Sequence, residues 1–181
     1  MRIIGGEWGG RKIHPPSKMP YTRPTTDIAK EGLFNILQSN RGLEGLKTLD
    51  LFGGTGSISF ELASRGANEL TIVEKDSQML AFIRKTAETL GLSQLKVVSS
   101  DVFRFLKNNT EQYDFIFAGP PYALENIEKI PEHIIGGNML KENGWFVLEH
   151  TPRNRFTGFP LFVSERNYGT TIFSIFIKKA G

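Results

Sequence analysis

The sequence predicts an α/β fold with a mostly parallel sheet of seven strands, and two observations support this. Short β-prone runs alternate with segments whose apolar residues recur at helical spacing, which is typical of parallel strands joined by helices. The last two β-prone runs are joined by a short polar loop, as in an antiparallel hairpin at the edge of a sheet. The seven runs are 48–52, 69–75, 95–100, 113–118, 144–150, 161–164 and 170–177.

Helices are predicted between these runs. Thr25 or Thr26 can cap a helix that continues to about Gln38, and Ser77 can cap a longer helix that ends at Gly91. Shorter helices are expected over 57–65 and 103–106. The segment 126–140 is predicted to be helical with a break near Pro131.

Length and composition predict one cytoplasmic domain. The chain has 181 residues, which is enough for a full core. It has no cysteine, and its three histidines lack metal-ligand spacing, so we expect no disulfide and no metal. The N-terminus lacks the apolar region of a signal peptide, and the apolar runs are too short to cross a bilayer. We expect a monomer without membrane contact.

The stretch Thr48–Ile58 joins an apolar strand to the following helix through a turn, Gly53–Gly56. Strand, glycine turn and helix form the opening of a nucleotide-type βαβ unit. Glycines in the turn let the backbone approach a ligand closely, and the free N–H groups at the helix start suit an anionic group. The dinucleotide fingerprint G-x-G-x-x-G is incomplete, because Ser59 stands at the third glycine position.

Acidic residues lie near the carboxyl ends of the first three strands: Asp50, Glu74 and Asp101. In open α/β sheets, ligands bind at that edge, and an acid at the position of Glu74 reaches ribose hydroxyls. The pattern that begins at Asp50 resembles motif I of the S-adenosylmethionine (SAM) methyltransferases, where the acid lies near the ammonium of the cofactor. The predicted cofactor is SAM, with a site formed by Asp50, Phe52, Gly54, Thr55, Gly56, Glu74, Lys75, Asp101 and Val102.

The fourth strand ends on Gly119-Pro120-Pro121-Tyr122. Methyltransferases that act on exocyclic base amines or amide nitrogens carry Asp, Asn or Ser, then Pro-Pro and an aromatic residue, at this place. An exocyclic amine is a poor nucleophile because its lone pair is delocalised into the ring. Acceptors placed against its N–H bonds localise the lone pair, and the aromatic ring stacks on the base. These four residues are the predicted catalytic loop.

The chain resembles the RsmD-like family, SAM-dependent guanine-N2 methyltransferases of small-subunit ribosomal RNA, along nearly its whole length. The resemblance rests on stretches 1–6, 23–27, 49–56, 73–76, 101–103 and 117–122. It implies a Rossmann-like methyltransferase fold, the cofactor and base-holding roles given above, and ribosomal RNA or the small ribosomal subunit as partner.

The N-terminal region is the basic part of the chain, since residues 1–30 hold six basic against two acidic residues. A positive segment suits a phosphate backbone, and an aromatic ring among basic residues can stack on bases. We expect residues 1–24 to form a basic β-hairpin and proline-rich loop that grip RNA, ahead of a methyltransferase domain over 25–181. A Trp packed on the main body is the alternative. The predicted RNA-binding residues are Arg2, Trp8, Arg11, Lys12 and Arg23.

Gly119 departs from the family pattern, which has Asp there. The lost hydrogen bond should cost about 2–4 kcal/mol of transition-state stabilisation. A neighbour such as Asp114 or Glu149 substitutes, or activity is reduced, or the chain binds SAM and RNA without efficient transfer.

Other functions remain open alongside these three. They are a dehydrogenase, for which no acid–base residue was found, a noncatalytic RNA-binding module, and an adenine-N6 or protein-amide methyltransferase.

Overall fold

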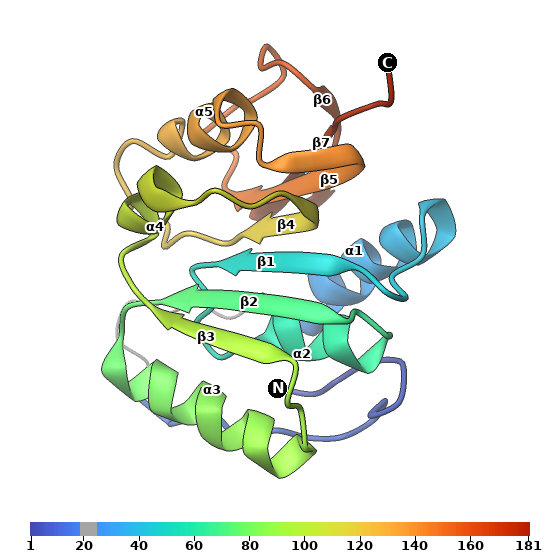
Figure 1. The fold of residues 1–181 in the computed structure, drawn as a ribbon, viewed down its shortest axis with the longest axis vertical. Coiled ribbons are helices and arrows are strands. Elements are labelled where there is room, and N and C mark those ends of the chain that lie inside the picture. The colour runs from blue at the N-terminus through green and yellow to red at the C-terminus, as the bar shows by residue number, and fades with distance from the viewer. Residues whose placement is uncertain (19–24) are drawn as a thin grey trace.

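One seven-stranded sheet forms the centre of the protein (Figure 1). The structure is a computed structural model that describes residues 1–18 and 25–181. Across the sheet the strands follow the order β3-β2-β1-β4-β5-β7-β6. Their bounds are β1 (Lys47–Leu51), β2 (Glu69–Glu74), β3 (Leu95–Ser99), β4 (Tyr113–Ala118), β5 (Leu140–His150), β6 (Phe162–Tyr168) and β7 (Thr171–Ile177).

The directions of the strands confirm the predicted fold class. β3, β2, β1, β4 and β5 run parallel, whereas β7 is antiparallel to β5 and β6 is antiparallel to β7. The C-terminal hairpin therefore supplies an antiparallel edge, as its two closely spaced runs predicted. β7 is inserted between β5 and the edge strand β6.

Helices cover both faces of this sheet. They are α1 (Asp27–Asn40), α2 (Ser57–Ser64), α3 (Ser77–Leu90), α4 (Val102–Asn108) and α5 (Lys129–Gly136). α1, α2 and α3 contribute to one buried apolar cluster, and α4 and α5 contribute to a second cluster. In Figure 1, α4 and α5 lie in front of the sheet, and α1 and α2 lie behind it. None of the helices in the described ranges is long and apolar enough to span a membrane.

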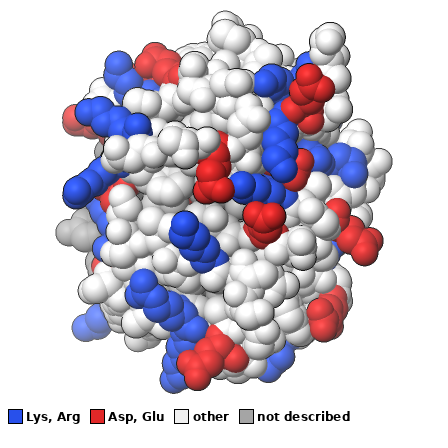
Figure 2. Space-filling model, viewed as in Figure 1, with Lys and Arg blue, Asp and Glu red and all other residues white. Residues whose placement is uncertain are grey.

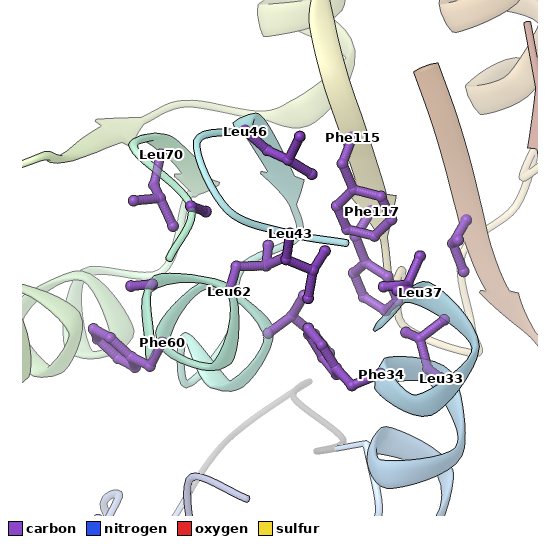
Figure 3. Close-up of a cluster of buried hydrophobic side chains, with 14 of the residues drawn as sticks. Leu33, Phe34, Leu37, Leu43, Leu46, Phe60, Leu62, Leu70, Phe115 and Phe117 are labelled. Atoms are coloured by element: carbon purple, nitrogen blue, oxygen red, sulfur yellow. The ribbon is translucent and has the colours of Figure 1, made fainter. Parts of the chain in front are cut away.

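The alternation of side chains along β4 explains the two clusters. Phe115 and Phe117 belong to the cluster of α1 and α2, whereas Ile116 and Ala118 belong to the cluster of α4 and α5. Figure 3 shows the first cluster, in which Phe34 of α1 lies on the same side of the sheet as these two phenylalanines. Because both faces of the strand are covered, it reads as a continuous apolar run.

Helix ends follow local chemistry. Thr26 caps α1, with its hydroxyl accepting a hydrogen bond from the N–H three residues on. The predicted Ser77 cap of α3 is wrong, because the Asp76 carboxylate caps the helix and Ser77 is its first residue. Both residue types are good caps, so sequence alone did not decide between neighbours. Gly91 ends α3 in the left-handed region, with φ 68°, as predicted.

The segment 126–140 also differs from the prediction. α5 covers only Lys129–Gly136, and Leu140 already belongs to β5. Pro131 causes no break, because it lies in the first turn, where its missing N–H has no partner within the helix. β5 begins four residues before the predicted Gly144, in a region where its pairing with β4 shifts register.

The N-terminal segment folds back on itself and packs on the body of the protein. Arg2 and Lys12 form an antiparallel bridge, and the Ile3 N–H donates to the Arg11 carbonyl at 2.9 Å. Ile3 is fully buried in the cluster of α1 and α2. The division into an RNA-gripping extension and a methyltransferase domain stays a prediction.

Candidate active site

A cavity of about 760 Å³ lies at the carboxyl ends of the parallel strands. The strand order reverses there, because the chain proceeds from β1 to β2 on one side and later to β4 on the other. Such a switch point is where open α/β sheets bind ligands. Nearly all of the predicted cofactor residues and the whole predicted catalytic loop line this one cavity, namely Asp50, Phe52, Gly54, Thr55, Glu74, Lys75, Asp101, Val102, Gly119, Pro120, Pro121 and Tyr122.

The turn between β1 and α2 is held by its own backbone. Phe52 and Gly56 have positive φ values of 60° and 82°, which strains the phenylalanine and suits the glycine. The N–H of Gly53 donates to the Val73 carbonyl of β2 at 2.9 Å. A Cβ on Gly53 would lie 2.3 Å from the side chain of Ile72, so this glycine is required for close packing on β2.

Glu74 organises the rim of the cavity. Its Oε1 accepts the N–H of Gly54 at 2.8 Å, and its Oε2 accepts the N–H groups of Lys75 and Asp76 at 2.9 and 2.8 Å. One carboxylate thus ties the end of β2 to the glycine turn after β1. Its position at the cavity agrees with the predicted one.

Asp50 is a nearly fully buried acid of β1 on the wall of the cavity. The Ser59 hydroxyl of α2 donates to its Oδ2 at 2.7 Å. Burial raises the pKa of Asp50 to about 7, the hydrogen bonds of Ser59 oppose the rise, and the charge of Glu74 adds to it. A cationic group in the cavity would favour the charged carboxylate, so this wall suits an ammonium.

Asp101 and Val102 lie at the end of β3. The Asp101 carboxylate caps α4, accepting the Arg104 N–H at 3.1 Å, and is exposed to solvent. Val102 is buried under the rim. Both line the cavity, across the carboxyl edge of the sheet from the loop that follows β4.

The predicted catalytic loop is anchored to the sheet. Gly119 donates its N–H to the Leu51 carbonyl at 3.3 Å, and the Pro121 carbonyl accepts the Leu124 N–H at 2.9 Å. Pro120 is buried, whereas Pro121 and Tyr122 are half-buried. The Tyr122 hydroxyl lies 3.5 Å from the Thr171 hydroxyl. The loop therefore has its first residues fixed and its aromatic ring at the cavity.

The two acids considered as substitutes at position 119 lie near opposite ends of neighbouring parallel strands, Asp114 near the start of β4 and Glu149 near the end of β5. Asp114 accepts the N–H of Lys47, the first residue of β1, at 2.9 Å and pairs with Lys141 at 3.6 Å, away from the cavity. Glu149, near the end of β5, lines the cavity and is 5% exposed. Only Glu149 is placed to act there.

Four of the predicted RNA-binding residues, Arg2, Trp8, Arg11 and Lys12, lie outside the cavity. Arg2 pairs with Asp27 at 3.2 Å on the surface, and Arg11 and Lys12 are exposed. Trp8 is half-buried against the core, which is the packed arrangement given above as the alternative. Arg23 lies outside the described residues.

Charges of both signs are present on the face of the protein that Figure 2 shows. In the view of Figure 2, basic and acidic side chains lie among one another. Within residues 1–18 and 25–181, no three potential metal-ligating side chains gather.

Several cavity residues were not found by sequence reasoning. They are Thr25, Ser57, Ile58, Asp76, Ser77, Ser100, Phe103 and Phe117, among others. Phe117 in β4 and Phe103 in α4 look like core residues in the sequence, since an apolar residue within a strand or helix pattern carries no separate signal for a ligand. Ser77 was predicted only as a helix cap, and Asp76 only as part of the stretch 73–76 on which the resemblance rests. Conversely, predicted Gly56 is not among the residues that line the cavity. It is the N-cap residue of α2, where a Cβ would lie 2.6 Å from Phe60.

The fold and the site together define a class, a Rossmann-like methyltransferase domain that uses SAM. Comparisons with known proteins agree with this class. The profile of a family described as "Conserved hypothetical protein 95" matches residues 1–177, and the chain belongs to that family. The predicted RsmD-like resemblance is thereby confirmed.

Relatives of known sequence and structure cover most of the chain. The "Ribosomal RNA small subunit methyltransferase D" of Escherichia coli (strain K12) is 34% identical over 82% of this chain and 71% of its own length. The "Putative rRNA methyltransferase YlbH" of Bacillus subtilis (strain 168) is 30% identical over 99% of this chain and 100% of its own. The solved "Putative methyltransferase yhhF from Escherichia coli" superposes with a TM-score of 0.85 at 28% identity, covering 100% and 99% of the two chains.

Proposed function

We propose that the protein transfers a methyl group from SAM to the exocyclic N2 of a guanine in small-subunit ribosomal RNA. One observation carries the proposal: a single cavity is lined both by the acids Asp50 and Glu74 and by the Pro120–Tyr122 loop. The first set suits the cofactor and the second suits an amino group on a planar base. Two relatives, 34% and 30% identical to this chain, are named as a ribosomal RNA methyltransferase and a putative one.

The cofactor end of the cavity fits the charges of SAM. When bound, SAM supplies a methyl group on a positively charged sulfur. The buried carboxylate of Asp50 suits the ammonium of the cofactor, because pairing compensates the cost of its charge. The carboxylate oxygens of Glu74 lie on the rim and accept backbone N–H groups. The ribose hydroxyls of SAM would donate to the same oxygens, either beside these N–H groups or in their place. Asp101, after the neighbouring strand β3, also lines the cavity, and its carboxylate would accept a hydrogen bond from the adenine amino group.

The substrate end of the cavity fits a base that has left its stack. Tyr122 offers a ring for stacking, and the carbonyl of Pro120 offers an acceptor for an amine N–H. Both prolines restrict the loop, and the Gly119 N–H is bonded to β1. Catalysis of this kind consists largely of positioning and of acceptors fixed in advance.

A second hollow supports a nucleic-acid partner. A groove of about 560 Å³ lies between the N-terminal segment and α3, and Arg11, Lys12 and Lys85 line it. Ser77 lines the cavity and the adjacent Gln78 lines the groove, so both hollows reach the first turn of α3. Basic side chains near the cavity suit the phosphates of a nucleic acid that extends along this face.

The test is transfer of labelled methyl from SAM to small ribosomal subunits that lack the modification. Nucleosides from the product are then separated by mass. We expect label in N2-methylguanosine. Label in N6-methyladenosine, or in a protein amide when protein is offered, would move the protein to the adenine-N6 or amide class. SAM binding without transfer to any of these would favour a noncatalytic RNA-binding role, which the missing acid at position 119 also suggests.

A further inference from the structure

Gly119 has no side chain to accept a hydrogen bond, but a carboxylate lies where such a side chain would extend. A Cβ built on Gly119 would lie 3.7 Å from Oε1 of Glu149 and 3.0 Å from Cε1 of Phe117. The direction in which position 119 would project its side chain therefore leads to the Glu149 carboxylate.

Sheet register explains this proximity. β4 and β5 run parallel and pair Phe117 with Val147 and Ala118 with Leu148. The next step of the same register brings Gly119 beside Glu149. Because side chains alternate along a strand, a side chain at position 119 would share the face of Phe117, and Glu149 shares the face of Val147. Phe117 and Val147 belong to the same buried cluster.

The environment of Glu149 keeps its carboxylate in place at the cavity. The side chain is almost completely buried and lines the cavity together with Gly119 and Tyr122. The Thr25 hydroxyl donates to Oε1 of Glu149 at 2.6 Å. Two carboxylate oxygens accept about four hydrogen bonds, so the bond from Thr25 does not by itself prevent Glu149 from accepting one from a substrate amine.

We propose that Glu149 is a catalytic residue that replaces the acid missing at position 119, accepting a hydrogen bond from the amino group of the target base. This role rests on the proposed function. The amine lone pair forms the new N–C bond while the C–S bond breaks and its electron pair stays on sulfur. The nitrogen then releases one proton, which Glu149 can accept and pass to water. Atoms and charge balance without a further reactant.

A side chain at position 119 is predicted to contact the carboxylate of Glu149. This contact can be tested without an activity assay. Asp at position 119 would place a second carboxyl beside the carboxylate of Glu149, whereas Asn would add the same bulk without charge. We expect Gly119→Asp to melt at least about 2 °C below Gly119→Asn near neutral pH. We expect the difference to vanish when both are combined with Glu149→Gln. If Gly119→Asp and Gly119→Asn melted at the same temperature while Glu149 is unchanged, the proposed contact would be overturned.

The catalytic role is tested by methyl transfer to small ribosomal subunits. We expect Glu149→Gln to lower kcat by about 10- to 100-fold, with the affinity for SAM and the KM for RNA changed less than about twofold. Glu142→Gln is the matched control, because Glu142 lies exposed at the other end of β5 and should leave kcat unchanged. Adding Gly119→Asp to Glu149→Gln should recover at least about tenfold, since an acid then returns to the same place.

The outcomes separate the two proposals. A wild type that transfers methyl to guanine N2, with Glu149→Gln equally active, would overturn the role of Glu149 and leave the proposed function intact. A Glu149→Gln defect that Gly119→Asp does not relieve, with lowered melting temperature, would assign Glu149 a structural role only. A wild type that binds SAM but methylates no guanine would overturn the proposed function, and the role of Glu149 with it.

Discussion

Glu61 and Asp50 are both buried carboxylates, but their pKa values are shifted in opposite directions. The oxygens of Glu61 accept the N–H groups of Ile4 and Gly5 at 2.9 Å each, and Lys30 and Arg65 pair with them at 3.1 and 2.8 Å. Burial opposes its ionisation, but these hydrogen bonds and charges prevail, and the pKa of Glu61 lies below the ordinary value. The N-terminal segment, α1 and α2 thus meet at one carboxylate.

Asp50 has a different environment. Ser59 donates to it, and among residues 1–18 and 25–181 no basic side chain pairs with it. Burial therefore prevails, and the pKa of Asp50 rises to about 7. The donors and cations around Glu61 fit a structural acid, whereas the unmatched charge of Asp50 fits the proposal that it pairs with a cationic ligand.

The largest expected effect comes from breaking the structural site. Lys30→Met removes the cation from Glu61 and also the donor to the Arg2 carbonyl, 2.8 Å away. Glu61 then keeps a buried charge without its lysine partner. We therefore expect the free energy of unfolding, measured in urea, to fall by about 3–5 kcal/mol. Lys129→Met is the control, since its pair with Glu132 is half exposed, and it should change stability by less than about 1 kcal/mol. Equal effects would contradict the comparison.

The same kind of change at Asp50 should have the opposite sign for stability. The folded-state pKa lies above the ordinary 3.8, so the folded protein binds this proton more tightly than the unfolded chain. The resulting cost is complete above about pH 7 and disappears as the pH falls toward about 4. Asp50→Asn should therefore stabilise the protein without ligand at about pH 8, by up to about 4 kcal/mol. It should also weaken SAM binding at least about tenfold.

Urea unfolding at about pH 8 and about pH 5 checks the stability, and calorimetric titration checks the SAM affinity. A variant destabilised at both pH values would show that Asp50 is structural, like Glu61.

Glu74 combines both roles and should show an intermediate effect. Its oxygens hold three backbone N–H groups of the turn and the rim, so Glu74→Gln brings an amide N–H₂ against donors. We expect a loss of about 1–3 kcal/mol in stability together with weaker SAM binding. Glu69→Gln, at the exposed start of β2, should change neither. A loss of affinity with unchanged stability would reduce Glu74 to a ligand contact.

The smallest effect is the pH dependence of SAM binding to the wild type. Below about pH 7 the proton on Asp50 must leave before an ammonium can pair with it, so the affinity should fall by up to about tenfold per pH unit. Titrations between about pH 8 and about pH 5.5 measure the slope. In Asp50→Asn the slope should disappear. A slope that persists in this variant would assign it to another group.

Much of the fold was predictable because its signals are local. The glycine turn after β1, the apolar strands β1 and β4, and the short loop before β7 each depend on neighbouring residues only. One kind of error arose where two local choices were nearly equal, as with Asp76 and Ser77 at the start of α3. The early start of β5 arises from pairing with β4, which no local pattern records.

The candidate site was only half predictable for a related reason. Acids at strand ends are recognisable, because parallel strands bring their carboxyl ends to one edge. Whether an acid is paired depends on segments far away in the chain. Glu61 accepts the N–H groups of Ile4 and Gly5. The sequence did not predict this role, because Glu61 lies within an ordinary helix pattern.

The sequence by itself determined the class of fold, the glycine turn, the acids at the carboxyl edge and the absence of an acid at position 119. These follow from residue types at fixed spacing along one chain. Only the tertiary structure decided that Trp8 packs on the core, that Asp114 lies at the end of β4 away from the cavity, and that Glu149 lies beside Gly119. The physical reason is that sheet register and burial set these positions, and both arise from residues far apart in the sequence.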